Sequence, residues 1–300
     1  MRNVLCQALV AEASRADFVF LTGDLGYGAL EPLRAVMGPR FINAGVAEQN
    51  MVSVAAGLTA TGIRPWVYSI APFVYSRALE QIRNDISLHD LPVRLVGNGG
   101  GFAYGVMGAT HHALEDYGTL LCLPNLHVFV PAFADDVPAI VRTLMAFDRP
   151  SYLRLGRCEK PGDMALPAYA PWRQCLTGSG PTMLVVGPLA GGLLGRLRLL
   201  DTSRRPTVWV LTELPVHSPD LPQAFLDDLR RSQHLFVVEE HVAHGGAGQM
   251  LCHLLSLQGR MPAAFTHHYA RGYVSGRYGS QSFHRAECGL DPASLVAALD

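Results

Sequence analysis

The stretch Arg40–Met51 reads RFINAGVAEQNM and runs from a short apolar strand through a glycine turn into a helix. It places one carboxylate, that of Glu48, in the first turn of this helix, and apolar residues follow at helical spacing. A carboxylate between a strand and a buried helix needs a partner, because an unpaired buried charge is costly. Spacing alone favours a simple role, in which free amides and the helix dipole stabilise Glu48. The other motifs of the chain argue against this simple role.

Length and composition limit the classes of protein that the chain can form. Its 300 residues exceed one typical core and predict two domains. The chain is 49% hydrophobic and 16% charged, so we expect apolar surface to be buried against another chain as well. A net charge of −1 without a basic block argues against a nucleic-acid partner. No apolar run approaches the roughly 20 residues of a membrane helix, so we expect no membrane association.

Cysteine usage and the N-terminus indicate the compartment. Six cysteines are scattered without a Cys-x-x-Cys pair, which fits a reducing cytoplasm better than a disulfide framework or a zinc site. The first residues imitate a signal peptide weakly, because Gln7 and Glu12 interrupt an apolar core that is already short. We therefore expect an amphipathic helix over Val4–Arg15 and a cytoplasmic protein.

Strand and helix patterns alternate along the first half of the chain. Besides the strand and helix around Glu48, we expect strands at 18–21, 66–70, 93–96, 127–131 and 151–155, and helices at 73–89 and 135–146. This alternation predicts a parallel sheet with helices on both faces.

The periodicity then disappears from 156 to 181, where prolines and glycines are frequent. A second α/β unit follows, with strands at 183–187, 208–211 and 234–238. The sequence therefore predicts an α/β fold with two doubly wound domains, 1–157 and the smaller 182–300, joined by a linker at 158–181.

Three segments compete for a chemical role. The glycine-rich loop 97–101 lacks both nucleotide-binding spacings, so we interpret it as a loop that lines a substrate site. The segment 108–116 reads GATHHALED, and its adjacent histidines can hydrogen-bond a carbonyl or transfer protons, or merely cap the next helix. The segment 239–246, EEHVAHGG, offers too few ligands for a metal site and fits a structural loop. We predict no metal ligands in this chain.

Taken together, these segments resemble the transketolase family. The run FINAGVAEQN at 41–50 resembles the glutamate motif of its pyrimidine-binding domain. Further matches follow in order and extend the resemblance over residues 20–157: Ala71–Phe73, Glu80–Asp85, the glycine-rich loop with Thr110–His112, Leu123–Asn125 and Tyr152–Leu155. Residues 183–300 look like the family's C-terminal α/β domain, including its turn at 239–248.

The resemblance covers the second and third of the three domains that transketolases usually carry. The first domain of the family holds magnesium and the diphosphate of thiamine diphosphate. The resemblance therefore implies one half of a split, two-component transketolase, whose N-terminal-type partner subunit supplies the Mg²⁺ ligands and the diphosphate site. Since the family places its cofactor between chains, an α2β2 assembly is implied.

The resemblance also assigns cofactor contacts. Glu48 would bond to N1′ of the aminopyrimidine and favour the tautomer that takes the proton from C2 of the thiazolium. Phe73 would stack on the pyrimidine, with Tyr75 as the alternative. Asp24 and Leu25 lie where the family contacts the thiazolium side of the cofactor.

On the substrate side, His111 would meet a carbonyl or hydroxyl of the sugar, and His112 would assist. Arg157 would grip a sugar phosphate, and Arg2 is a second candidate. Three positions depart from the family, because they lack its hydroxyl-binding aspartate and its phosphate-binding histidine and serine: Met107, Gly99 and Gly28. We therefore expect transfer of a two-carbon ketol unit from a ketose to an aldose, with sugars that differ from the usual phosphates.

Other functions stay open at this point. Within the superfamily these are a 2-oxo acid dehydrogenase β-subunit and a deoxyxylulose phosphate synthase fragment; outside it, a non-catalytic binding subunit. The wording GVAEQN around Glu48 and the histidine loop favour transketolase over the dehydrogenase subunits. A synthase is expected in one long chain, and the presence of Glu48 argues against a non-catalytic subunit.

Overall fold

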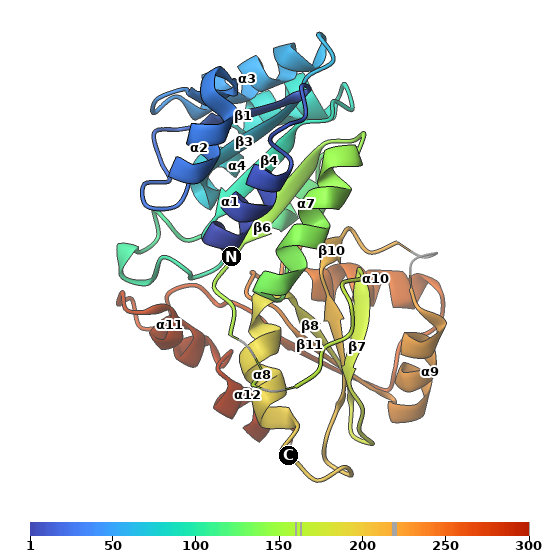
Figure 1. Cartoon of the computed structure of the whole chain (residues 1–300). Helices are drawn as coiled ribbons and strands as arrows, with labels where there is room; N and C mark the ends of the chain where they lie inside the picture. The colour runs from blue at the N-terminus through green and yellow to red at the C-terminus, as the bar shows by residue number, and fades with distance from the viewer. Residues whose placement is uncertain (160, 163, 218–220, 300) are drawn as a thin grey trace.

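The structure of the chain is a computed structural model, which describes residues 1–159, 161–162, 164–217 and 221–299. In these ranges the strands form two sheets, the first built mainly from the first half of the chain and the second from the second half. Each sheet is flanked by its own helices, and the two α/β units lie one beyond the other along the molecule (Figure 1). The predicted α/β fold class is confirmed.

The first sheet has seven strands, and its long central strands are buried on both faces. Apolar runs such as FVFLT form such strands because neither face meets water. The order across the sheet is β10 (Glu213–Leu214), β5 (His127–Phe129), β6 (Ser151–Leu155), β4 (Arg94–Asn98), β3 (Arg64–Ile70), β1 (Phe18–Thr22) and β2 (Phe41–Asn43). The pairings from β5 to β2 are parallel, whereas β10 runs antiparallel to β5.

Helices cover both faces of this sheet, as predicted. One face packs against α1 (Arg2–Ala11), α2 (Glu31–Met37) and α7 (Val137–Ala146). The other packs against α3 (Glu48–Thr59), α4 (Ala71–Tyr75) and α6 (Asp116–Leu121). The helix expected over 73–89 is broken into α4, the short α5 (Leu79–Gln81) and a π-type turn over Ile82–Ser87.

The second sheet has five strands in the order β12 (Ala264–His268), β11 (His234–Val238), β8 (Thr182–Val186), β9 (Thr207–Leu211) and β7 (Trp172–Leu176). Strands β12 to β9 are parallel, and β7 is an antiparallel edge strand. One face packs against α8 (Ala190–Leu197) and α12 (Pro292–Ala297), and α11 (Gln281–Cys288) adds Cys288 to this core. The other packs against α9 (Gln223–Ser232) and α10 (Ala247–Leu257).

Three strands lie where the sequence predicted none, and one of them is β12 at the edge of the second sheet. Strand β7 falls inside the expected linker 158–181, and β10 carries a piece of the second half of the chain into the first sheet. We propose 1–157 and 182–300 as the two domains. Residues 160 and 163 of the proposed linker, and residues 218–220 and 300 of the second domain, lie outside the described residues.

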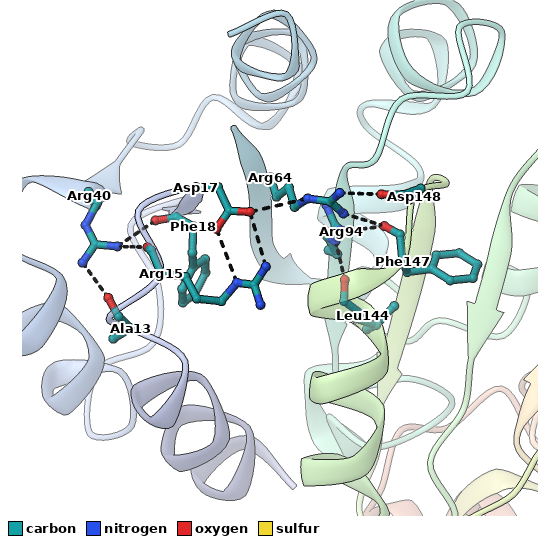
Figure 2. Close-up of polar contacts among 10 residues, drawn as sticks. All are labelled: Ala13, Arg15, Asp17, Phe18, Arg40, Arg64, Arg94, Leu144, Phe147 and Asp148. Atoms are coloured by element: carbon teal, nitrogen blue, oxygen red, sulfur yellow. Dashed lines mark hydrogen bonds and ion pairs between the residues drawn. The ribbon is translucent and has the colours of Figure 1, made fainter. Parts of the chain in front are cut away.

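Arginines at the amino ends of the central strands form hydrogen bonds and ion pairs with neighbouring segments (Figure 2). Arg94 at the start of β4 is buried, donates to the carbonyl of Leu144 at 2.8 Å, and has its pKa lowered to about 10 by burial. Arg64 at the start of β3 pairs with Asp148 at 2.5 Å, and Arg40 before β2 donates to three carbonyls around the start of β1. These contacts fix the sheet at the end opposite to the predicted site.

In the described parts of the chain, every helix is too short or too polar to cross a bilayer.

Candidate functional site

The predicted site residues come from five loops and helix starts at the carboxyl ends of the first sheet, the edge where ligands collect in α/β folds. The loop after β1 carries Asp24 and Leu25, and α3 after β2 begins with Glu48. Helix α4 after β3 carries Phe73 and Tyr75. The loop after β4 carries His111 and His112, and Arg157 follows β6.

The Glu48 carboxylate is buried and paired by side chains. Glu48 is 5% exposed, and its Oε1 accepts a long hydrogen bond of 3.5 Å from the Ser69 hydroxyl at the end of β3. Nη1 of Arg77 lies 3.3 and 3.4 Å from the two carboxylate oxygens. The carboxylate of Glu48 is therefore bound by side chains from β3 and from the turn after α4, instead of the helix amides that spacing suggested. The sequence reasoning missed Arg77, which is 29 residues away.

Arg77 also covers Phe73. Its guanidinium carbon lies 3.8 Å from the centroid of the Phe73 ring, one helical turn earlier. The Phe73 ring and the Glu48 carboxylate were both predicted to contact a pyrimidine. In this structure both contact the planar guanidinium of Arg77. An open hollow of about 420 Å³ lies beside them, lined by Val46–Asn50 and Arg77.

The two candidate stacking rings have different surroundings. Tyr75 is 6% exposed, and its hydroxyl donates to Glu115 at 3.3 Å. Burial, the main cause, and nearby carboxylates raise the pKa of Tyr75, so its hydroxyl stays protonated. Phe73 is half-buried and lies beside Glu48's partner. The geometry therefore favours Phe73 as the ring that meets a ligand.

His111 joins this cluster through Phe73. The two rings meet edge to face with centroids 5.2 Å apart, and the ring of Tyr104 lies 5.6 Å from His111 on another side. Nδ1 of His111 hydrogen-bonds Thr110 Oγ1 at 2.8 Å. In the described ranges Nε2 of His111 has no hydrogen-bond partner, so it can meet a substrate oxygen.

His112 points elsewhere. It is 4% exposed, its Nδ1 lies 2.9 Å from the hydroxyl of Tyr273, and its Nε2 lies 2.8 Å from the carbonyl of Gly105. Burial lowers the pKa of His112, so the ring is neutral near pH 7. With both ring nitrogens engaged, His112 lies in the contact with the C-terminal half of the chain.

Asp24 is held in a left-handed turn with φ of 58°. Asn43 at the end of β2 donates to its carboxylate at 2.8 Å and accepts from its backbone amide at 3.1 Å. The same Asn43 oxygen accepts from the amide of Gly45, before the Glu48 helix. Asn43 thus couples two of the site loops, a role that sequence reasoning missed. Leu25 lines a hollow of about 170 Å³ beside Asp24.

Arg157 is exposed just beyond β6. Burial raises the pKa of Tyr104, while a hydrogen bond from Asn98 and the charges of Arg2 and Arg157 lower it. Both arginines therefore act on the ring that neighbours His111. Positive charge therefore acts on this part of the site, where it would favour an anionic group.

In the described ranges no three His, Cys, Asp or Glu side chains gather closely enough to hold a metal ion.

Comparison with known proteins defines the class. Residues 1–161 match the family described as transketolase, pyrimidine binding domain. The chain therefore belongs to the transketolase family and carries its pyrimidine-binding domain.

Relatives that are single subunits of a transketolase match 80% or more of the chain. One such subunit of the apulose-4-phosphate transketolase of Phocaeicola vulgatus is 29% identical over 80% of this chain and 78% of its own length. The subunit of the same name from Actinobacillus succinogenes is 27% identical over 99% and 96%. A solved split-gene transketolase, an inactive β4 tetramer, has a TM-score of 0.81 and 28% identity over 99% and 96% of the two chains.

Longer relatives match through part of their length. 1-Deoxy-D-xylulose-5-phosphate synthase of Myxococcus xanthus is 30% identical over 90% of this chain, which spans 46% of the synthase. Transketolase from Leishmania mexicana, at 18% identity and a TM-score of 0.77, shares the fold.

Proposed function

We propose that this chain is the pyrimidine-binding subunit of a split, thiamine-diphosphate-dependent transketolase. It transfers a two-carbon ketol unit from a ketose to an aldose together with a partner subunit that holds the diphosphate and Mg²⁺. The observation that carries the proposal is the joint contact of Glu48 and Phe73 with one planar, nitrogen-rich group. The family membership and the relatives named as transketolase subunits support it.

The residues present fit the pyrimidine half of the cofactor. An aminopyrimidine needs a hydrogen-bonding carboxylate at its edge and an aromatic surface under its face. The Arg77 guanidinium is likewise flat, cationic and rich in N–H groups, and it receives both contacts here. The site is therefore suited to a planar ring that shares a proton with Glu48.

Each residue of this chain then has a defined task. Bound thiamine diphosphate supplies the electron sink for the two-carbon unit. Glu48 holds a proton at the ring nitrogen from a buried position, where hydrogen bonds to a carboxylate are strengthened. Phe73 fixes the plane of the ring. His111 directs its free Nε2 toward the carbonyl or hydroxyl oxygen of the sugar, whose charge changes during the reaction.

The substrate is expected to differ from the usual pentose and hexose phosphates. Met107, which is 54% exposed, stands on the His111 loop at the position where the family has a hydroxyl-binding aspartate, and its neighbour Val106 is 74% exposed. Arg2 and Arg157 still supply positive charge near Tyr104. We propose a donor or acceptor that is unphosphorylated or bulkier. Steady-state comparison of phosphorylated and free ketoses with the reconstituted pair tests this; a clear preference for xylulose 5-phosphate would refute it and leave the ketol-transfer proposal intact.

The partner is proposed to cover the edge of the first sheet beside the site. Large apolar side chains around β2 are exposed there: Tyr27 at 79%, Val46 at 75%, Val54 at 42% and Ile42 at 37%. Apolar surface of this kind marks a binding interface. We expect an α2β2 assembly when the two subunits are mixed, measured by native mass spectrometry. The six free cysteines agree with the proposed cytoplasmic location.

Similarity to the synthase makes a deoxyxylulose-phosphate-synthase reaction the second candidate. The two reactions differ in their donor, because the synthase decarboxylates pyruvate and a transketolase cleaves a ketose. Incubation of the reconstituted pair with pyruvate and glyceraldehyde 3-phosphate separates them. Carbon dioxide release from pyruvate would favour the synthase and overturn ketol transfer.

A further inference from the structure

We propose that the C-terminal half of this chain positions the His111 loop, and that His112 and Tyr273 are the positioning pair through which it does so. This inference rests on the proposed function, because it concerns where His111 is held. It assigns His112 to holding its neighbour instead of touching the sugar.

The hydrogen bonds define how His112 is locked. Its Nε2 lies 2.8 Å from the carbonyl of Gly105, which can accept but not donate, so Nε2 carries the proton. Nδ1 of the neutral ring is then an acceptor, and the hydroxyl of Tyr273 donates to it at 2.9 Å. Burial raises the pKa of Tyr273 to about 12, which keeps this donor protonated. The two rings also stack, at an interplanar angle of 17°.

A second anchor holds the start of the same loop. The amide of Phe102 donates to Glu240 at 3.2 Å, and Glu240 is fixed by an ion pair with Arg285 at 2.7 Å. The Phe102 ring stacks on His284 of α11, with centroids 5.0 Å apart. Both anchors come from residues after 239, whereas the loop belongs to the first sheet.

Between its anchors the loop has few ties to its own domain. Its base is fixed where Gly99 and Gly100 donate to the carbonyl of Leu155, and where Gly101 and Ala113 bond each other. Among the described residues, the ring contacts and hydrogen bonds that tie 102–112 to the first domain are the Phe73 ring on His111 and the bond from Asn98 to Tyr104. Within the loop, the Tyr104 ring also packs on His111. The backbone of Gly105 packs against residues 279–281. The contacts with the C-terminal half therefore fix the position of the loop, and the position of the loop determines where His111 lies.

The consequence for catalysis follows from the peptide bond between the two histidines. Because His112 is locked into the C-terminal half, His111 is directed to the other side, where it meets Phe73. A displacement of about 1 Å in a catalytic group can cost up to about a hundredfold in rate. A loosened His112 should thus slow turnover without changing cofactor binding.

The test uses two matched variants of the full chain. Tyr273→Phe removes the donated hydrogen bond and keeps the stacked ring. Tyr278→Phe is the control, because Tyr278 lies on the same segment, is 57% exposed, and its hydroxyl has no hydrogen bond to any described residue. Amide hydrogen exchange is measured on the chain alone, and ketol transfer on the reconstituted pair.

We expect amide exchange over residues 105–112 to accelerate roughly three- to tenfold in Tyr273→Phe, and by less than about twofold in the control. We also expect kcat to fall about tenfold in Tyr273→Phe, with the KM for thiamine diphosphate unchanged. The proposal would be overturned if amide exchange over 105–112 were unchanged in Tyr273→Phe, or if it accelerated equally in the control. It would also be overturned if exchange accelerated equally across 182–300, or if kcat stayed unchanged although exchange over 105–112 became faster. A wild-type pair without ketol transfer would contradict the proposed function instead, while the exchange data still decide whether Tyr273 holds the loop.

Discussion

Replacing Arg77 by alanine should strengthen binding of thiamine diphosphate to the reconstituted pair. Arg77 contacts both groups that are assigned to the pyrimidine ring, so its contacts with Glu48 and Phe73 oppose cofactor binding. The ion pair is long at 3.3 Å, and the arginine side chain is 48% exposed, which limits its contribution to about 1 kcal/mol. The cation–π contact adds about 0.5–1 kcal/mol.

Removal of a competing interaction of about 1–2 kcal/mol lowers the apparent Kd of the cofactor by about five- to thirtyfold. The measurement is a calorimetric titration of the pair with thiamine diphosphate at fixed Mg²⁺. Arg83→Ala is the matched control, because Arg83 is an exposed arginine a short distance along the same helical region and is bonded to its neighbour Asn84. This control should bind like the wild type. If Arg77→Ala weakened cofactor binding tenfold, Arg77 would hold the cofactor instead of occupying its position, and the reasoning would be refuted.

Three further predictions concern stacking, specificity and acid stability. Phe73→Leu should raise the KM for thiamine diphosphate about three- to tenfold, whereas Tyr75→Phe should not; the reverse order would identify Tyr75 as the stacking ring. Met107→Asp should raise kcat/KM for hydroxyl-rich sugar phosphates about tenfold over wild type, and no gain in steady-state assays would remove Met107 from the specificity argument. Burial lowers the folded-state pKa of His112 and His241 below 6.5, so at acidic pH the unfolded chain binds more protons than the folded chain. The free energy of unfolding should therefore fall as the pH drops through about 6.5. A urea midpoint that stays constant from about pH 7.5 to 5.5 would contradict this.

The sequence predicted the fold where strands are long and buried. Strands such as β1 and β8 are continuous apolar runs because both faces are covered. Strand β10 has two residues and pairs with a strand more than eighty residues earlier, so no local periodicity signals it. Strand β7 lies among prolines and glycines that suggested a linker. The helix over 73–89 has an apolar side, but that pattern does not predict its π-type turn.

The site was predicted less completely, because its contacts are tertiary. The resemblance proposed Glu48 and Phe73 as cofactor contacts, but it did not indicate that Arg77 contacts both of them. The i, i+4 spacing of Phe73 and Arg77 was a readable signal for a cation over a ring. The contact of His112 with Tyr273 spans 161 residues and has no local signal. Adjacent histidines look equivalent in a sequence, whereas the turn directs them to opposite sides.

The central claim is that Glu48 activates the cofactor. The most direct test is the rate at which the C2 proton of bound thiamine diphosphate exchanges with deuterium in the reconstituted pair. Glu48→Gln preserves the shape of the side chain and removes its proton-sharing carboxylate. We expect exchange to slow at least about a hundredfold while the cofactor still binds. Exchange at the wild-type rate in cofactor-saturated Glu48→Gln would contradict the account.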